Sequence, residues 1–194
     1  PIPEMLARYR QALTDWPQPI EPAPSITWEY GGLSLADQLE GLRRNQVGEV
    51  CRIDLLTSKL HEGKAQDKLR WDLLIRAWPA HLGMQLIQPQ SQTLLIGQTG
   101  NVMLPALSQA DAEHYLADLF DAWLAGMAAP LPLACKTGFT WLTNGKDAMK
   151  SFEKEIENSL ALARCWPDYE TLVTQPMFAE WAHKLYYPII AQFA

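Results

Sequence analysis

Apolar residues recur at helical spacing in the first stretch of the chain and at alternate positions in the stretch that follows. In residues 3–13, PEMLARYRQAL, the apolar stripe predicts a short helix. Residues 16–24 hold four prolines and predict an extended connector. SITWEY, residues 25–30, places Ile, Trp and Tyr on one face and therefore predicts a strand.

A hairpin and a third strand are predicted next. Gly31 and Gly32 are typical of a tight turn, which leads into a return strand over residues 33–42. After a polar loop, GEVCRIDLLTS at residues 48–58 has apolar residues throughout and predicts another strand. We expect the three strands to pair with one another in antiparallel order.

Helical spacing returns over residues 61–83, HEGKAQDKLRWDLLIRAWPAHLG. The stripe through Trp71 and Trp78 predicts a helix that packs these rings in the core and ends at Gly83. His81 lies near the predicted end of this helix. A surface or capping role suits it better than metal ligation, because the four histidines of the chain show no ligand spacing.

A strand pair and further helices complete the chain. Residues 92–107 predict two strands with a turn at Gly100 and Asn101, and Ser108 is placed to cap the next helix. Residues 127–145 are rich in proline and glycine and predict a loop, with two or three helices after it.

This order of elements predicts an α/β or α+β fold with one mixed central sheet flanked by helices. The length suits a single domain, residues 1–194, and an apolar fraction of 48% with eight tryptophans can build its core. The opening PIPEMLARYR lacks a starting Met and indicates a fragment of a larger protein. No run approaches the roughly 20 apolar residues of a membrane span, and no secretion signal opens the chain.

The net charge and the absence of common catalytic motifs narrow the range of possible functions. The net charge of −6 argues against a stand-alone nucleic-acid binder, so any DNA contact should be local or shared with other subunits. The chain contains no GxxxxGK[ST], GxSxG, CxxC or HExxH sequence, and we therefore expect no cofactor and no metal site. Its three cysteines are widely spaced, which is typical of reduced thiols in a cytoplasmic protein.

Arg52 and Asp54 lie two apart in the third strand and should point to the same face. Helix, three antiparallel strands, helix and strand is the core order of the restriction-endonuclease-like PD-(D/E)XK nucleases. In those enzymes an acid on one strand and the acid of a D/E-x-K pair on the next strand hold Mg²⁺, and the Lys of the pair helps to orient the nucleophile. Here Arg52-Ile53-Asp54 stands in place of D/E-x-K, and Glu40 lies near the position of the first acid.

The order of charge is thus reversed, and a guanidinium, which cannot lose its proton, would occupy or repel a metal ion. Three interpretations stay open on the residues alone. The pair is an ordinary ion pair on a half-solvated face, the remnant of a catalytic site, or part of an active Mg²⁺ nuclease that uses Glu40 and Asp54.

The run LLIGQTGNVMLPALSQADAEHYLADLFDAWLAGMAAPLPL, followed by CKTGFTWL, resembles the C-terminal region of the gamma subunit of exodeoxyribonuclease V (RecC). The likeness lies in a short hairpin, a helix that ends in a Gly-Met-x-x-Pro-Leu turn, and a Gly-x-x-Trp-Leu strand. RWDLLIRAWPAHLG and the terminal YYPIIAQF fit the same pattern.

The resemblance implies a nuclease-like fold without catalytic residues, in which Glu40, Arg52 and Asp54 are the remnant of the site. It also implies that the domain scaffolds the alpha and beta subunits and helps to split duplex DNA ends, through a pin, during double-strand break repair by recombination. Arg43, Arg44 and Lys64 are then the candidate DNA contacts. A module that binds only protein partners is the remaining alternative.

Overall fold

A five-stranded mixed sheet with the order β1-β4-β5-β8-β9 organises the N-terminal part of the chain. Its strands are β1 (Gln18–Pro19), β4 (Leu42–Arg44), β5 (Val50–Leu55), β8 (Gln92–Gly97) and β9 (Gly100–Leu104). Only the β5–β8 pair is parallel among the pairings in this sheet. The structure is a computed structural model that describes residues 2–63 and 65–193. A mixed sheet flanked by helices confirms the predicted fold class at that level.

The chain divides into two compact units at Leu116. The sheet belongs to the first unit, and a set of helices makes up the second. The single domain expected for residues 1–194 stays a prediction.

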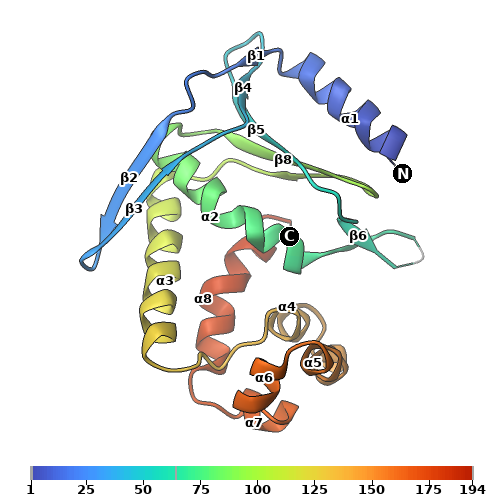
Figure 1. Cartoon of the computed structure of the whole chain (residues 1–194), viewed down its shortest axis with the longest axis vertical. Coiled ribbons are helices and arrows are strands. Elements are labelled where there is room, and N and C mark those ends of the chain that lie inside the picture. Colours follow the sequence, from blue (N-terminus) through green and yellow to red (C-terminus); the bar gives the residue numbers. More distant parts are fainter. Residues whose placement is uncertain (1, 64, 194) are drawn as a thin grey trace. The chain divides into compact units, whose positions relative to one another are not determined.

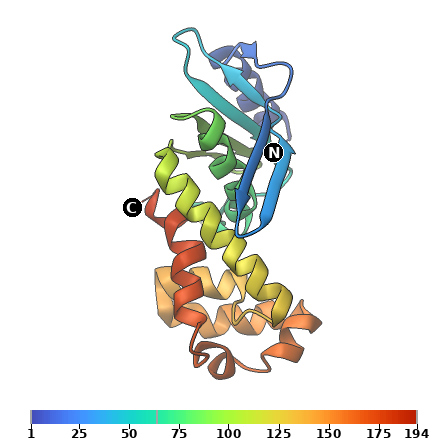
Figure 2. The ribbon, with the colours of Figure 1, turned by 90° about the vertical axis from the view of Figure 1, so that its left-hand side faces the viewer.

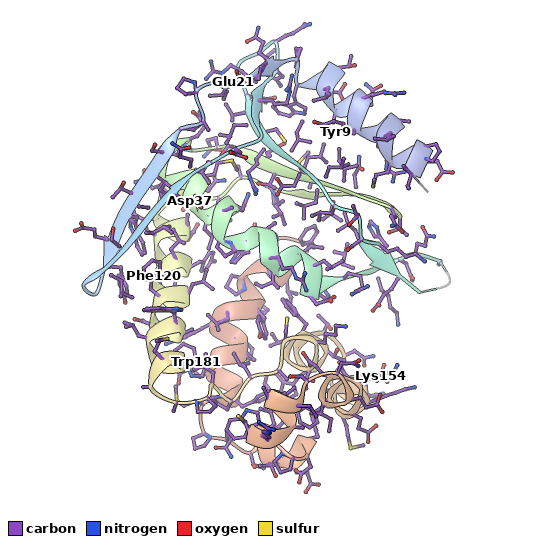
Figure 3. All side chains as sticks on the ribbon, viewed as in Figure 1. Tyr9, Glu21, Asp37, Phe120, Lys154 and Trp181 are labelled. Carbon is purple, nitrogen blue, oxygen red and sulfur yellow. The ribbon has the colours of Figure 1, made fainter. Side chains whose placement is uncertain are left out.

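Helices α1 (Ile2–Asp15) and α2 (Trp71–Ile87) cover opposite faces of the sheet (Figure 1). On one face, Met5 and Ala12 of α1 pack against Cys51 and Ile53 of β5, as well as residues of β8. Tyr9 of α1, labelled in Figure 3, adds to this cluster. Because neighbouring residues of a strand point to opposite faces, the even-numbered residues of β5 point toward α2.

The α2 helix is the crossover between the parallel strands β5 and β8, and it lies over the second face. Its His81 contacts Thr93 of β8, which is the register partner of Arg52. Parallel neighbours in register share a face, so Arg52 and Asp54 lie on the face that α2 covers. The helix runs through Gly83 to Ile87, so its predicted end was wrong.

The hairpin of β2 (Ser25–Tyr30) and β3 (Leu33–Gln38) forms a separate two-stranded sheet, and the two strands run side by side in Figure 2. The hairpin and its turn were predicted, but its pairing with the third strand was wrong, because β5 pairs with β4. The reason is Gly41, whose φ of +78° lies in a region that residues with a side chain rarely adopt. The predicted return strand over residues 33–42 is interrupted before this turn.

Shorter features of the first unit also depart from the sequence pattern. A small hairpin of β6 (His61–Glu62) and β7 (Lys68–Leu69) occupies the beginning of the helix predicted over residues 61–83. The β8–β9 turn falls at residues 98–99, two positions before the predicted turn at Gly100 and Asn101.

Helix α3 (Gln109–Ala128) begins directly after Ser108, where the sequence predicts a helix. Ser108 Oγ accepts the Asp111 N–H at 3.0 Å and donates to Asp111 Oδ2 at 2.6 Å. The serine hydroxyl thus satisfies one of the free N–H groups of the first turn, and the predicted cap is confirmed.

The second unit is helical. Its further helices are α4 (Cys135–Asn144), α5 (Ala148–Glu157), α6 (Leu160–Cys165), α7 (Tyr169–Val173) and α8 (Phe178–Ala191), with a 3₁₀ turn at Gly145–Asp147. Figure 3 labels Lys154 on α5 and Trp181 on α8. Residues 135–142, expected as part of a loop and as a strand, belong to α4, so both expectations were wrong; four α-helices follow α4, more than the two or three predicted.

A core of its own supports this second unit. The buried side chains of Phe152, Leu172 and Phe178 meet there, and Trp141 packs edge-on against Phe178 with ring centroids 5.2 Å apart.

Across the part of the chain that the structure describes, no helix combines the length and the apolar character that a membrane span requires.

Candidate functional site at the Arg52–Asp54 pair

Strand β5 carries both charges of the site on the face toward α2. Arg52 Nη1 lies 2.8 Å from Asp54 Oδ2, so the two side chains form an ion pair on the shared face that the strand period predicts. The Nη1 group has no hydrogen-bond partner among the described residues, because its N–H groups are not aimed at the carboxylate. The attraction is therefore mainly that of two opposite charges at close range.

Both side chains of the pair are largely withdrawn from water. Their exposed fractions are 18% for Arg52 and 22% for Asp54. Burial raises the pKa of the Asp54 carboxyl, and the neighbouring Arg52 charge lowers it by less than burial raises it. The fold thus holds Asp54 where its charged form is disfavoured even with a cation beside it.

Glu40 takes part in the site through its backbone. Arg52 Nε donates to the Glu40 carbonyl oxygen at 3.3 Å. The residue is exposed and lies between β3 and β4 rather than on a strand, which corrects its predicted place on the second strand. Extension of the β4–β5 register would set position 40 opposite Asp54, but Gly41 turns the chain before that position is reached.

The site opens into a groove of about 740 Å³. Its lining comes from both strands of the β2–β3 hairpin, from the segment that follows β3, and from one residue each of β5 and α2, namely Arg52 and Ala80. Among residues 2–63 and 65–193, no group of three or more His, Cys, Asp or Glu side chains is arranged to hold a metal ion.

His81 is a residue of this face that sequence reasoning missed. It is fully buried rather than at the surface, so the predicted surface or capping role was wrong. Nε2 lies 3.0 Å from the Pro105 carbonyl oxygen and Nδ1 lies 2.9 Å from Thr93 Oγ1. A carbonyl can only accept, so Nε2 carries the hydrogen and Nδ1 accepts from the threonine hydroxyl.

The electrostatics of His81 follow from this position. The pKa of His81 is lowered to about 4, mainly by burial; the hydrogen bond to Pro105 opposes this effect, and the charge of Arg52 adds to it. The imidazole is therefore neutral at pH 7. The sequence signal was present, because positions 74, 78, 81, 82 and 85 form one buried helical stripe.

The candidate DNA contacts have different surroundings. Arg43 donates from Nε to the Trp16 carbonyl at 2.5 Å and from Nη2 to the Pro17 carbonyl at 2.7 Å, which ties the proline-rich connector to β4. Arg44 is exposed. Lys64 lies outside the described residues. A DNA-binding role for these three residues stays a prediction.

Comparison with known proteins decides the family. A family model for the RecC C-terminal domain matches residues 1–146. The chain belongs to the RecC C-terminal domain family. The matched region includes Arg52, Asp54 and the hairpin, and it ends just after α4.

A RecC protein is also similar to this chain by direct comparison. The RecBCD enzyme subunit RecC of Escherichia coli (strain K12) is 28% identical over 144 residues. The match covers 67% of this chain and 13% of that protein, so the chain corresponds to a small part of the length of this RecC.

Proposed function

We propose that this chain is a non-catalytic, nuclease-like domain of the gamma subunit of the exodeoxyribonuclease V helicase–nuclease complex. The observation that supports the proposal is the Arg52–Asp54 ion pair, which we equate with the D/E-x-K position of the nucleases. A guanidinium 2.8 Å from the carboxylate provides the positive charge that a divalent ion would otherwise bring.

The arrangement of the first unit supports the nuclease-like part of the proposal. Helix α1, the antiparallel strands β1, β4 and β5, the crossover helix α2 and the parallel strand β8 follow the core order expected of the PD-(D/E)XK enzymes. The hairpin β2–β3 is then an insertion between the first two of those strands.

A scaffolding role follows from the family. The similar RecC protein of Escherichia coli is a subunit of the RecBCD enzyme, and we propose the alpha and beta subunits of such a complex as partners of this domain. The three cysteines are free thiols, which supports a reducing, cytoplasmic setting.

The β2–β3 hairpin is our candidate for the element that helps to part the strands of a duplex end. Trp28 and Tyr30 stack on its apolar face with ring centroids 5.6 Å apart and an interplanar angle of 2°. The hairpin carries no Lys or Arg, so contact with DNA would be made by stacking on bases rather than by pairing with phosphates.

A nuclease assay separates this proposal from an active Mg²⁺ enzyme. The purified chain is incubated with linear duplex DNA and Mg²⁺, alone and as Asp54→Asn and Glu40→Gln variants. We expect no cleavage above background by any of them. Mg²⁺-dependent cleavage that disappears with Asp54→Asn would favour the active nuclease that uses Glu40 and Asp54, and would end the non-catalytic proposal.

Gel mobility shifts with duplex ends test the DNA part against a module that binds only proteins. Binding at low salt that weakens steeply as salt rises is expected for phosphate contacts. We expect Arg44→Ala to weaken that binding, and we expect Trp28→Ala with Tyr30→Ala to slow duplex unwinding by the assembled complex. Absence of both effects would leave protein binding as the role of the domain.

A further inference from the structure

The groove beside Arg52 offers a strand edge. Residues 36–39, at the end of β3 and just beyond it, line the groove. Within the described part of the chain, β3 pairs with β2 alone, so its outer edge has no strand beside it. A strand edge of this kind can accept an added strand through main-chain hydrogen bonds.

The register shows which backbone groups point outward. The Leu39 N–H donates to the Pro24 carbonyl at 2.9 Å, so residue 39 bonds inward, toward β2. Bonded and outward-directed residues alternate along an antiparallel strand, which leaves the backbone groups of Ala36 and Gln38 directed outward. The Gln38 N–H is taken by Asp37 Oδ1 at 2.8 Å, a local bond that satisfies the donor until another acceptor arrives.

The charges that line the groove determine what kind of added strand could bind there. Asp37, labelled in Figure 3, and Glu40 are exposed and line the groove. Arg52 is the only cation in the lining that the structure describes, and Asp54 offsets its charge at 2.8 Å. The groove is therefore acidic, which repels the phosphates of DNA and attracts Lys or Arg side chains.

We propose that an extended segment of a partner subunit, bearing Lys or Arg, adds as a strand to the outer edge of β3 and lies in this groove. The inference rests on the proposed scaffolding function and names the surface that performs it. The main-chain bonds supply the attachment, and Asp37 and Glu40 select a basic segment over an acidic one. The remnant of a nuclease site would then bind a polypeptide instead of a nucleic acid.

Cross-linking in the assembled complex tests this proposal. The photoreactive residue p-benzoylphenylalanine replaces Gln38 in the full-length subunit, which is then purified with the alpha and beta subunits and irradiated. We expect a cross-link to a Lys- or Arg-bearing, non-helical segment of one of those subunits, identified by mass spectrometry. The same replacement at Glu29, an outward-facing residue of β2 that does not line this groove, is the matched control and should give no such product.

Charge reversal provides a second measurement. Asp37→Lys together with Glu40→Lys should lower the cross-link yield by about tenfold, as the loss of roughly 1.4 kcal/mol of charge attraction would. Glu29→Lys, in the same hairpin, should leave the yield unchanged. A yield that is insensitive to the double reversal would overturn the proposal.

The other outcomes separate failure of this inference from failure of the proposed function. Three subunits that co-purify without a cross-link at position 38 overturn the inference and leave the scaffolding function intact. A product with DNA, with a second copy of the subunit or with an acidic segment also overturns it. Subunits that fail to co-purify at all overturn both.

Discussion

Arg52 and Asp54, two residues apart on β5, bring their charged groups within 2.8 Å on the sheet face that α2 covers. Both members of the pair come from one strand, so strand formation alone brings them to the same face. The pair then lies near the neutral His81 of α2, whose pKa its arginine helps to lower. One strand and one helix thus fix the positions of the three charged or titratable groups on this face.

Arg52→Met should destabilise the chain by about 2 kcal/mol. This value lies between the 0–1 kcal/mol of an exposed ion pair and the 3–5 kcal/mol of breaking a fully buried one, because both partners are mostly but not wholly buried. For a chain of this length, the melting temperature should fall by about 4–8 °C. Thermal unfolding followed by circular dichroism measures the shift.

Arg44→Met is the control for that experiment. Arg44 is exposed, and its replacement should change the free energy of unfolding by less than about 0.5 kcal/mol. Equal melting temperatures for wild type and Arg52→Met would show that the ion pair contributes nothing to stability.

The stability of Asp54→Asn relative to wild type should rise with pH. The pKa of Asp54 is raised in the fold above its ordinary value of 3.8. In the pH range between the ordinary pKa and the raised one, the native state therefore binds more protons than the unfolded state. Wild type therefore loses stability as pH rises through this window, and the variant lacks that loss. Urea denaturation of both proteins at pH 4 and pH 7 provides the comparison. A relative stability that falls with pH would mean that the fold favours the charged carboxylate.

His81→Gln should make the chain less sensitive to acid. The folded pKa is about 4 against an ordinary value of 6.5, so below pH 6.5 the unfolded state takes up a proton that the native state excludes. Wild type should lose about 2 kcal/mol of stability between pH 7.5 and pH 5 from this residue. The variant should start lower at pH 7.5 and lose less. Urea titrations at the two pH values test this, and parallel losses in both proteins would refute it.

Gly138→Ala should destabilise the second unit. A Cβ at this position of α4 would lie 2.5 Å from Tyr186 Cε2, and that ring is buried and stacked on Phe139. The cost of such overpacking is about 1–3 kcal/mol. Gly126→Ala is the matched helical control, because a Cβ there meets Leu131 at an ordinary 3.7 Å and should add about 0.5–1 kcal/mol of stability. Opposite shifts in melting temperature are expected, and a shift of the same sign in both would contradict the packing argument.

Local signals in the sequence were sufficient for some of the elements. The stripe in residues 3–13 predicted α1, and Gly31 with Gly32 predicted the turn of the hairpin. The helix cap at Ser108 was equally local. In each case the deciding interactions join residues close together in the chain, so the pattern alone contains them.

Features that depend on contacts between residues far apart in the chain could not be predicted from local patterns. The pairing of β5 with β4 rather than β3 depends on a three-residue strand and on the turn at Gly41, neither of which leaves a periodic pattern. Helix α4 follows two closely spaced prolines, which suggested a loop. For the site, the strand period predicted the Arg52–Asp54 contact, but the burial of His81 and the groove depend on how α2 and the hairpin pack.

The charge order on β5 has an evolutionary consequence. To change Arg-x-Asp into Asp-x-Lys, both charges of the pair must be inverted, and either inversion made first sets two like charges on neighbouring positions of one half-buried face. Each single-step intermediate would carry a penalty in stability before any catalytic benefit appeared. The double inversion keeps opposite charges side by side. Each of the two end states should therefore be more stable than an intermediate in which only one of the charges has been inverted.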